Sequence, residues 1–184
     1  MQAQHRKGYF ISDANAVYFL TMTVVEWLEV FIRPQLAEIL LDNLRFCIAH
    51  KQLQVHAWCL MPNHLHLLCT QPAGKLSDVL RDFKSFTAKR IYQSLSTGQI
   101  PESRKQLLLN RLQFAGTPHG QGFKLWQEGN HPMVCYSRCF LEQKLHYIHD
   151  NPVKAGFVRE PEHYRYSSAY DYMGGQGLLP LVPI

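Results

Sequence analysis

The sequence lacks the features that would place it in a membrane or among disulfide-bonded proteins. Its longest apolar run falls well short of the ~20 residues that a helix needs to cross a bilayer, and no amino-terminal signal peptide is visible. The five cysteines form an odd number without a Cys-x-x-Cys pair, so neither a disulfide framework nor a zinc ribbon is expected. These absences predict a cytoplasmic protein with reduced thiols and no membrane partner.

Charged residues are scarce, at 18% of the chain, and the sequence has no internal repeat. A chain of 184 residues can bury one substantial core, so we expect a single domain over 1–184 whose core spans about 17–172. The net charge of +5 favours a polyanionic partner, although many basic proteins bind no nucleic acid.

The most informative segment contains two histidines at positions i and i+2 inside an apolar run. On a strand, alternate residues project from the same face, so His64 and His66 would point together while Leu65 and Leu67 enter the core. Neutral imidazole is a common metal ligand, and two histidines leave coordination positions free for a third residue and a substrate. Two polar residues on the solvent-exposed face of an amphipathic strand would give the same pattern, so the pair alone does not establish a metal site.

The elements around this pair follow from the spacing of apolar residues and from turn and cap signals. Strands are predicted at 17–25, 54–60 and 63–70, with a hairpin turn at 61–63, and helices at 34–50, 76–95 and 138–151. Ser137 would cap the last helix, which Pro152 is expected to end near Asn151. The remaining segments are predicted as a loop-rich insertion at 96–122 around a helical piece at 104–114, irregular covering structure at 156–172, and a loose tail at 174–184.

Tyr147 and Asn151 are four residues apart in the last predicted helix and would share one face. A phenol can act as a nucleophile and form a covalent intermediate if a metal polarises the group under attack. An amide oxygen one turn away can complete a metal site begun by two histidines. A tyrosine on an amphipathic helix is more often a packing residue, and the chain has nine tyrosines, so these residues alone do not single out Tyr147.

Two motifs in this order resemble those of the single-tyrosine HUH transposases. They are Asn63-His64-Leu65-His66 and Tyr147-Ile148-x-x-Asn151-Pro152-Val153-Lys154-Ala155-Gly156. Within that family the chain resembles the REP-associated tyrosine transposases, with further matches at Leu125-Trp126-Gln127 and at Tyr164-x-Tyr166-Ser167-Ser168-Ala169. The similarity runs from about Tyr18 to Tyr172. It implies an α+β fold, with an antiparallel sheet flanked by helices, ferredoxin-like and similar to the palm of other HUH endonucleases.

The resemblance also implies a function, which is metal-dependent cleavage and rejoining of hairpin-flanked single-stranded DNA through a 5′-phosphotyrosine intermediate. His64 and His66 match the metal-binding histidines, with Mg²⁺ or Mn²⁺ as the implied cofactor, and Tyr147 matches the nucleophile. Asn151 stands where the insertion-sequence relatives carry a glutamine that joins the metal site. The implied partner is single-stranded DNA with hairpin-forming repeats. The REP-associated branch implies a monomer, whereas the insertion-sequence relatives act as dimers.

Basic side chains are the candidates for phosphate contacts, and exposed aromatic side chains would stack on unpaired bases. The principal basic candidates are Arg81, Lys84, Lys89, Arg90, Lys124 and Lys154, and the wider set adds Arg104, Lys105, Arg111 and Arg159.

Two other functions remain open on the sequence. One is a single-stranded nucleic-acid binding module on the same fold that has lost catalysis. The other is a zinc-dependent hydrolase that uses the histidine pair and needs a third strong ligand and a general base. The neighbourhood of the pair supplies no carboxylate, since Asp78 and Asp82 lie on the next predicted helix. A stable covalent tyrosyl–DNA adduct would distinguish the transesterase from both alternatives.

Overall fold

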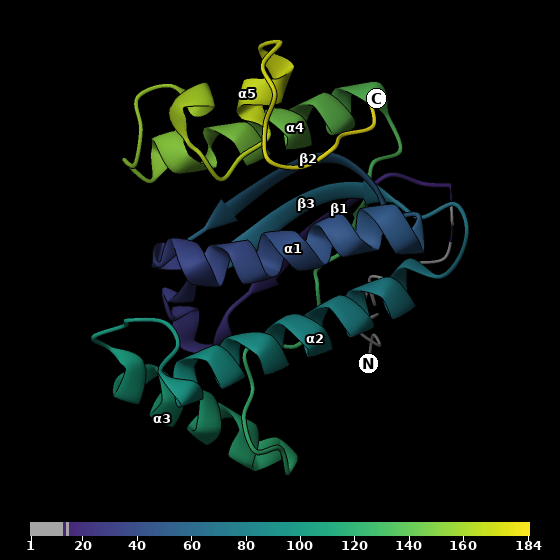
Figure 1. The fold of residues 1–184 in the computed structure, drawn as a ribbon. Helices are drawn as coiled ribbons and strands as arrows, with labels where there is room; N and C mark the ends of the chain where they lie inside the picture. The colour runs from purple at the N-terminus through teal and green to yellow at the C-terminus, as the bar shows by residue number, and fades with distance from the viewer. Residues whose placement is uncertain (1–12, 14) are drawn as a thin grey trace, which may run out of the picture.

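The computed structural model describes residue 13 and residues 15–184, and within them four antiparallel strands form one sheet in the order β2-β3-β1-β4. The strands are β1 (Tyr18–Thr23), β2 (Gln54–Met61), β3 (His64–Thr70) and the short β4 (Met133–Val134). Figure 1 shows α1 (Pro34–Lys51) and α2 (Leu76–Thr97) on one face of the sheet and α4 (Arg138–Lys154) on the other. This arrangement confirms the predicted α+β fold with an antiparallel sheet flanked by helices.

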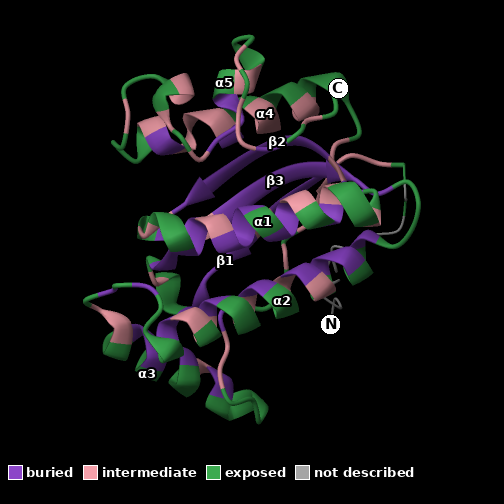
Figure 2. Cartoon of the chain, viewed as in Figure 1, coloured by how far each residue is buried: buried purple, intermediate pink, exposed green. Residues whose placement is uncertain are grey.

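The sheet separates two clusters of buried apolar residues, and Figure 2 shows its long strands coloured almost entirely as buried. Leu20 of β1 and Leu65 and Leu67 of β3 belong to the larger cluster, which also contains the buried residues of α1 and α2. Phe19 and Leu68 belong to the smaller cluster with Ile148 of α4. The alternation predicted for β3 is therefore confirmed, because successive side chains enter opposite layers.

The helices begin and end close to where the sequence predicts. α1 begins at Pro34, whose fixed φ suits a first helical position. α2 ends at Gly98, which adopts the left-handed conformation that favours glycine after a helix. Phe86 is half exposed, although the apolar spacing of this helix predicts a buried side chain there. None of the helices among the described residues is long and apolar enough to cross a membrane.

The predicted end of α4 near Asn151 is wrong, because the helix continues through Pro152 to Lys154. Proline lacks the N–H that would bond to the carbonyl of Ile148, but this removes only one hydrogen bond near the helix end. The next turn still closes, since Ala155 donates to the carbonyl of Asn151 at 3.0 Å. The Pro152 ring is buried, so packing offsets the missing bond.

The tail predicted as loose is docked against the edge of the sheet. The backbone N–H of Val182 donates to the carbonyl of Val55 at 2.8 Å, and His56 Nδ1 lies 2.8 Å from the carbonyl of Val182. Leu179 is only 3% exposed and belongs to the larger apolar cluster. A composition rich in glycine and proline therefore misled the prediction, because an extended segment can pair with an open strand edge without regular spacing.

The two segments predicted as irregular also contain short helices. Residues 96–122 contain α3 (Lys105–Gly116), which matches the predicted helical piece, and the 3₁₀ turn Thr117–His119. Leu108 and Leu112 are buried, so this insertion packs against the domain. The covering segment contains the 3₁₀ turn Pro161–His163 and α5 (Ala169–Tyr172), and Tyr166 accepts a backbone hydrogen bond from Leu60 of β2 at 2.8 Å.

Replacing Leu179 tests whether the tail contributes to the fold. Leu179→Ala would leave a cavity in the larger cluster and should lower the free energy of unfolding by about 2–4 kcal/mol, measured by urea denaturation. Val182→Ala is the matched control, because that side chain is 38% exposed, and a change within about 0.5 kcal/mol is expected. Equal stability of both variants and the parent would contradict a docked tail.

Candidate active site

His64 and His66 of β3 face α4 from the middle of the sheet. His64 is paired with Thr23 of β1, and His66 with Thr21. The two imidazole ring centres lie 4.6 Å apart, so the rings converge as the i, i+2 spacing predicts. His66 is buried and stacks on Phe19 at 5.6 Å between ring centres.

Hydrogen bonds fix which nitrogen of each imidazole carries the proton. Asn63 donates from Nδ2 to the carbonyl of Trp27 at 3.3 Å, which leaves its Oδ1 facing His64 Nδ1 at 2.6 Å. His64 must therefore donate from Nδ1. His66 Nε2 accepts from Asn151 Nδ2 at 3.1 Å, and its Nδ1 lies 3.0 Å from Thr21 Oγ1. Each histidine then carries a lone pair on Nε2, the form that binds metal ions.

Burial keeps both histidines neutral. It lowers the pKa of His66 to about 3, and the charge of Lys144, together with that of His64 when protonated, acts in the same direction. The pKa of His64 is also lowered by burial, and a hydrogen bond with Asn151 opposes that shift. Neutral imidazoles at ordinary pH keep the Nε2 lone pairs that a metal would take, and at His66 the metal would replace the hydrogen bond from Asn151.

Tyr147 and Asn151 share the face of α4 that is turned toward the histidines, as their i, i+4 spacing predicts. The Tyr147 ring centre lies 5.2 Å from that of His66, and the side chain is 41% exposed. Ile148, one residue along, is fully buried against the sheet and anchors the helix there. The phenol is therefore held beside the histidine pair while it stays open to solvent.

A basic residue that the sequence analysis missed, Lys144, lies beside the phenol. Its Nζ is 5.6 Å from the centre of the Tyr147 ring and 4.7 Å from that of Phe19. Lys154, which is predicted to contact phosphate, also lies near the phenol, with Nζ 6.0 Å from the ring centre and 3.6 Å from Asp150 Oδ2. The i−3 spacing of Lys144 from Tyr147 was the signal that could have identified it.

The other principal basic candidates lie away from the histidines. Arg81, Lys84, Lys89 and Arg90 belong to α2, which covers the opposite face of the sheet (Figure 1). Arg81 is paired with Asp78 at 2.8 Å and with Asp82 at 3.0 Å. Both carboxylates belong to α2, as predicted, so neither supplies the general base that a zinc hydrolase would need beside the histidines.

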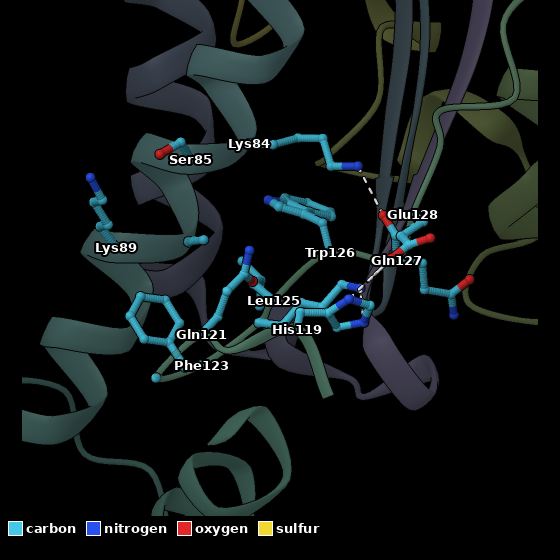
Figure 3. Close-up of a pocket in the computed structure, with 13 residues that line it drawn as sticks. Lys84, Ser85, Lys89, His119, Gln121, Phe123, Leu125, Trp126, Gln127 and Glu128 are labelled. Atoms are coloured by element: carbon cyan, nitrogen blue, oxygen red, sulfur yellow. Dashed lines mark hydrogen bonds and ion pairs between the residues drawn. The ribbon is translucent and has the colours of Figure 1, made fainter. Parts of the chain in front are cut away.

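Lys84 and Lys124 line a cleft of about 590 Å³ between α2 and the segment 119–128 (Figure 3). Lys84 donates to the carbonyls of Gln127 and Gly129 at 2.9 and 3.1 Å, and to Asn130 Oδ1 at 3.1 Å. Burial and the charge of Lys124 lower the pKa of Lys84 to about 8. All three N–H donors are used within the chain, so Lys84 holds residues 127–130, and its phosphate contact stays a prediction.

The residues at the centre fit a divalent metal through two imidazole nitrogens and one amide. Asn151 faces His66 with Nδ2, so ligation would use Oδ1, the other atom of the same amide. Among residue 13 and residues 15–184, no group of three or more His, Cys, Asp or Glu side chains is arranged to hold a metal. The structure brings His64, His66 and Asn151 together, and this donor set stays a prediction.

Comparison with known proteins gives the chain its family. The model of the family described as IS200-like transposases matches residues 14–111, which is more than half of the chain. The chain belongs to the IS200-like transposase family. The matched residues include His64 and His66 and end before Tyr147, so the position of Tyr147 rests on the geometry described above.

Two similar proteins support the more specific resemblance predicted from sequence. A Haemophilus influenzae protein named provisionally as a REP-associated tyrosine transposase is 24% identical over 154 residues, which cover 84% of this chain and 80% of that protein. A solved structure of a REP-associated tyrosine transposase bound to a REP hairpin matches with a TM-score of 0.66 at 17% identity, over 95% of this chain and 88% of that one. The second similarity confirms the fold.

The protonation of His66 can be measured by NMR on metal-free protein with ¹⁵N-labelled histidine. We expect His66 to remain the neutral Nδ1–H tautomer down to about pH 5, because its pKa lies far below the ordinary histidine value of 6.5. The unfolded chain binds this proton at a higher pH than the folded protein does, so His66 contributes a loss of stability as the pH falls below 6.5. Asn151→Ala removes the amide that donates to Nε2 and should give a mixture of tautomers. Titration of His66 near pH 6.5 would show that the arrangement is wrong.

Proposed function

We propose that this protein is a metal-dependent single-stranded DNA transesterase, which cleaves and rejoins hairpin-flanked DNA through a 5′-phosphotyrosine intermediate. The observation that carries the proposal is the convergence of a phenol and two neutral imidazoles within one chain. The Tyr147 and His66 ring centres lie 5.2 Å apart, and those of His66 and His64 lie 4.6 Å apart. Membership of a transposase family supports DNA as the substrate, and the similar solved structure is of a protein bound to a REP hairpin.

His64 and His66 would hold the divalent ion through their Nε2 atoms, and Asn151 through its amide oxygen. An ion bound there would neutralise charge on the scissile phosphate and fix its orientation. Mg²⁺ strongly prefers oxygen ligands, so Mn²⁺ suits a site with two nitrogen donors better. Asn63 and Thr21 would keep both imidazoles in the ligating tautomer.

Tyr147 would supply the nucleophile. A bond forms between its oxygen and the phosphorus while the bond from phosphorus to the 3′ oxygen breaks, and the proton lost by the phenol is balanced by the one that the 3′ oxygen gains. The 5′ end remains on Tyr147 as a phosphate ester. Because the ester conserves the bond energy, a second 3′-hydroxyl can reverse the step and join a new strand without ATP. Lys144 and Lys154, whose Nζ atoms lie within 6.0 Å of the Tyr147 ring centre, would attract the phosphate oxygens.

We propose further that a monomer performs the reaction. Tyr147 and Asn151 of α4 lie against the histidines of the same chain, and α4 contacts both β2 and β3. A site of this kind needs no helix from a partner subunit.

Formation of a covalent adduct tests the proposal. Purified protein would be incubated with labelled single-stranded hairpin DNA from the flanks of its own gene in the presence of Mn²⁺, and the products separated on a denaturing gel. We expect a protein–DNA band that EDTA abolishes, that Tyr147→Phe lacks entirely, and that His66→Ala reduces to near background. Tyr136→Phe is the matched control, because this tyrosine is 89% exposed and outside the site, and it should leave the band unchanged.

The alternatives give different results in the same assay. Binding of several hairpins without any adduct would indicate a module that has lost catalysis. Absence of both binding and adduct would contradict the proposal and leave the zinc hydrolase to be tested. An adduct that persists in Tyr147→Phe would assign the nucleophile to another residue.

A further inference from the structure

Trp27 places an exposed indole directly beside the histidine pair. Its ring centre lies 6.1 Å from that of His64, in an edge-to-face arrangement. The side chain is 59% exposed, whereas the other two tryptophans, Trp58 and Trp126, are 0% and 4% exposed. Most of the indole surface at this position is therefore open to solvent and makes no contribution to the core.

The backbone at Trp27 is held in a conformation that large side chains rarely adopt. Glu26 and Trp27 have φ values of 52° and 56°, both in the left-handed region that disfavours residues with a Cβ. The turn is closed by Trp27 N–H donating to the carbonyl of Val24 at 3.1 Å, and Arg111 contacts Glu26 at 3.3 Å. Strain of this kind persists only where the surroundings hold it, and it concentrates at functional sites.

The same turn is connected to the histidines by a hydrogen bond. The carbonyl of Trp27 accepts from Asn63 Nδ2, and Asn63 Oδ1 in turn accepts from His64 Nδ1. The strained peptide thus contributes to the orientation of His64 while its side chain extends into solvent next to that histidine. The rings of Trp27, His64, His66 and Tyr147 contact one another in succession across the site.

An exposed indole in this place fits the face of an unpaired nucleobase. Bases in a duplex are stacked on their neighbours, so only a single-stranded nucleotide can offer a free face, and stacking on an aromatic side chain tolerates any base. The scissile phosphate would lie between the histidines and Tyr147, and Trp27 borders the histidines next to His64, away from Tyr147. We infer that Trp27 stacks on the unpaired base of a nucleotide next to the scissile phosphate. This inference rests on the proposed function.

Intrinsic fluorescence tests the inference, because Trp27 is the only exposed tryptophan. Tyr147→Phe protein, which should bind without reacting, would be titrated with the hairpin DNA used for the adduct assay. We expect the DNA to quench the fluorescence, and Trp27→Phe to abolish that response while it retains part of the affinity, measured by anisotropy of labelled DNA.

Two further variants distinguish the contribution of the indole to DNA binding from that of the turn. Glycine adopts positive φ without strain, so Trp27→Gly removes the ring but keeps the backbone able to form the bond to Asn63. We expect it to fold normally and to weaken DNA binding about 5- to 100-fold. Phe46→Ala on α1 is the matched control, since Phe46 is 51% exposed on the opposite side of the sheet, and it should bind normally.

The partner base is identified with abasic DNA. Removing the base that stacks on Trp27 should weaken binding to the parent and have little further effect on Trp27→Gly, because two changes to one contact are not additive. Unchanged affinity of Trp27→Gly, or no quenching on binding, would overturn the inference even where the adduct forms normally. Quenching and base dependence without any adduct would support stacking while contradicting the transesterase. No binding by the parent would overturn both.

Discussion

The register of β3 is the constraint on which the rest of the site depends. This strand is hydrogen-bonded on both sides, to β1 and to β2, and its side chains alternate between two buried layers. His64 and His66 face α4 only because Leu65 and Leu67 fill the larger apolar cluster. A slip of one residue would exchange these sets and place two imidazoles among leucines. The core therefore holds the histidines in position.

The turn between β2 and β3 adds orientation to that position. The carbonyl of Asn63 accepts from Val24 N–H at 2.8 Å, and the carbonyl of Pro62 accepts from Phe31 N–H at 2.8 Å, so the turn is fixed to the segment that follows β1. Its Asn63 side chain then joins the backbone of Trp27 to the ring of His64. A turn held by these hydrogen bonds can fix the tautomer of His64, while the strand fixes the direction of its side chain.

Much of this arrangement follows from local sequence patterns. The period of two identifies the face shared by His64 and His66, and the i, i+4 spacing places Tyr147 with Asn151. The sequence does not predict the continuation of α4 past Pro152. Proline disfavours helical geometry in the residue before it, but this preference does not always end a helix. The docked tail depends on pairing with a strand far away in the chain, which leaves no periodic signal.

Local sequence patterns also do not predict the surroundings of the site. Lys84 carries the charge expected of a phosphate-binding residue, but three acceptors from residues 127–130 occupy its donors. Trp27 is exposed in a turn with two successive positive φ angles, a backbone conformation that the residue types in that segment do not predict. Both outcomes come from contacts between distant segments.

Anomalous diffraction from crystals of Tyr147→Phe grown with Mn²⁺ and single-stranded hairpin DNA tests the central claim most directly. The claim is that β3 and its neighbours direct two Nε2 lone pairs at one point. The account predicts a single manganese peak within bonding distance of Nε2 of both His64 and His66, with a DNA phosphate beside it and residue 147 next to the phosphate. A peak that contacts neither imidazole, or imidazoles that bind through Nδ1, would contradict it.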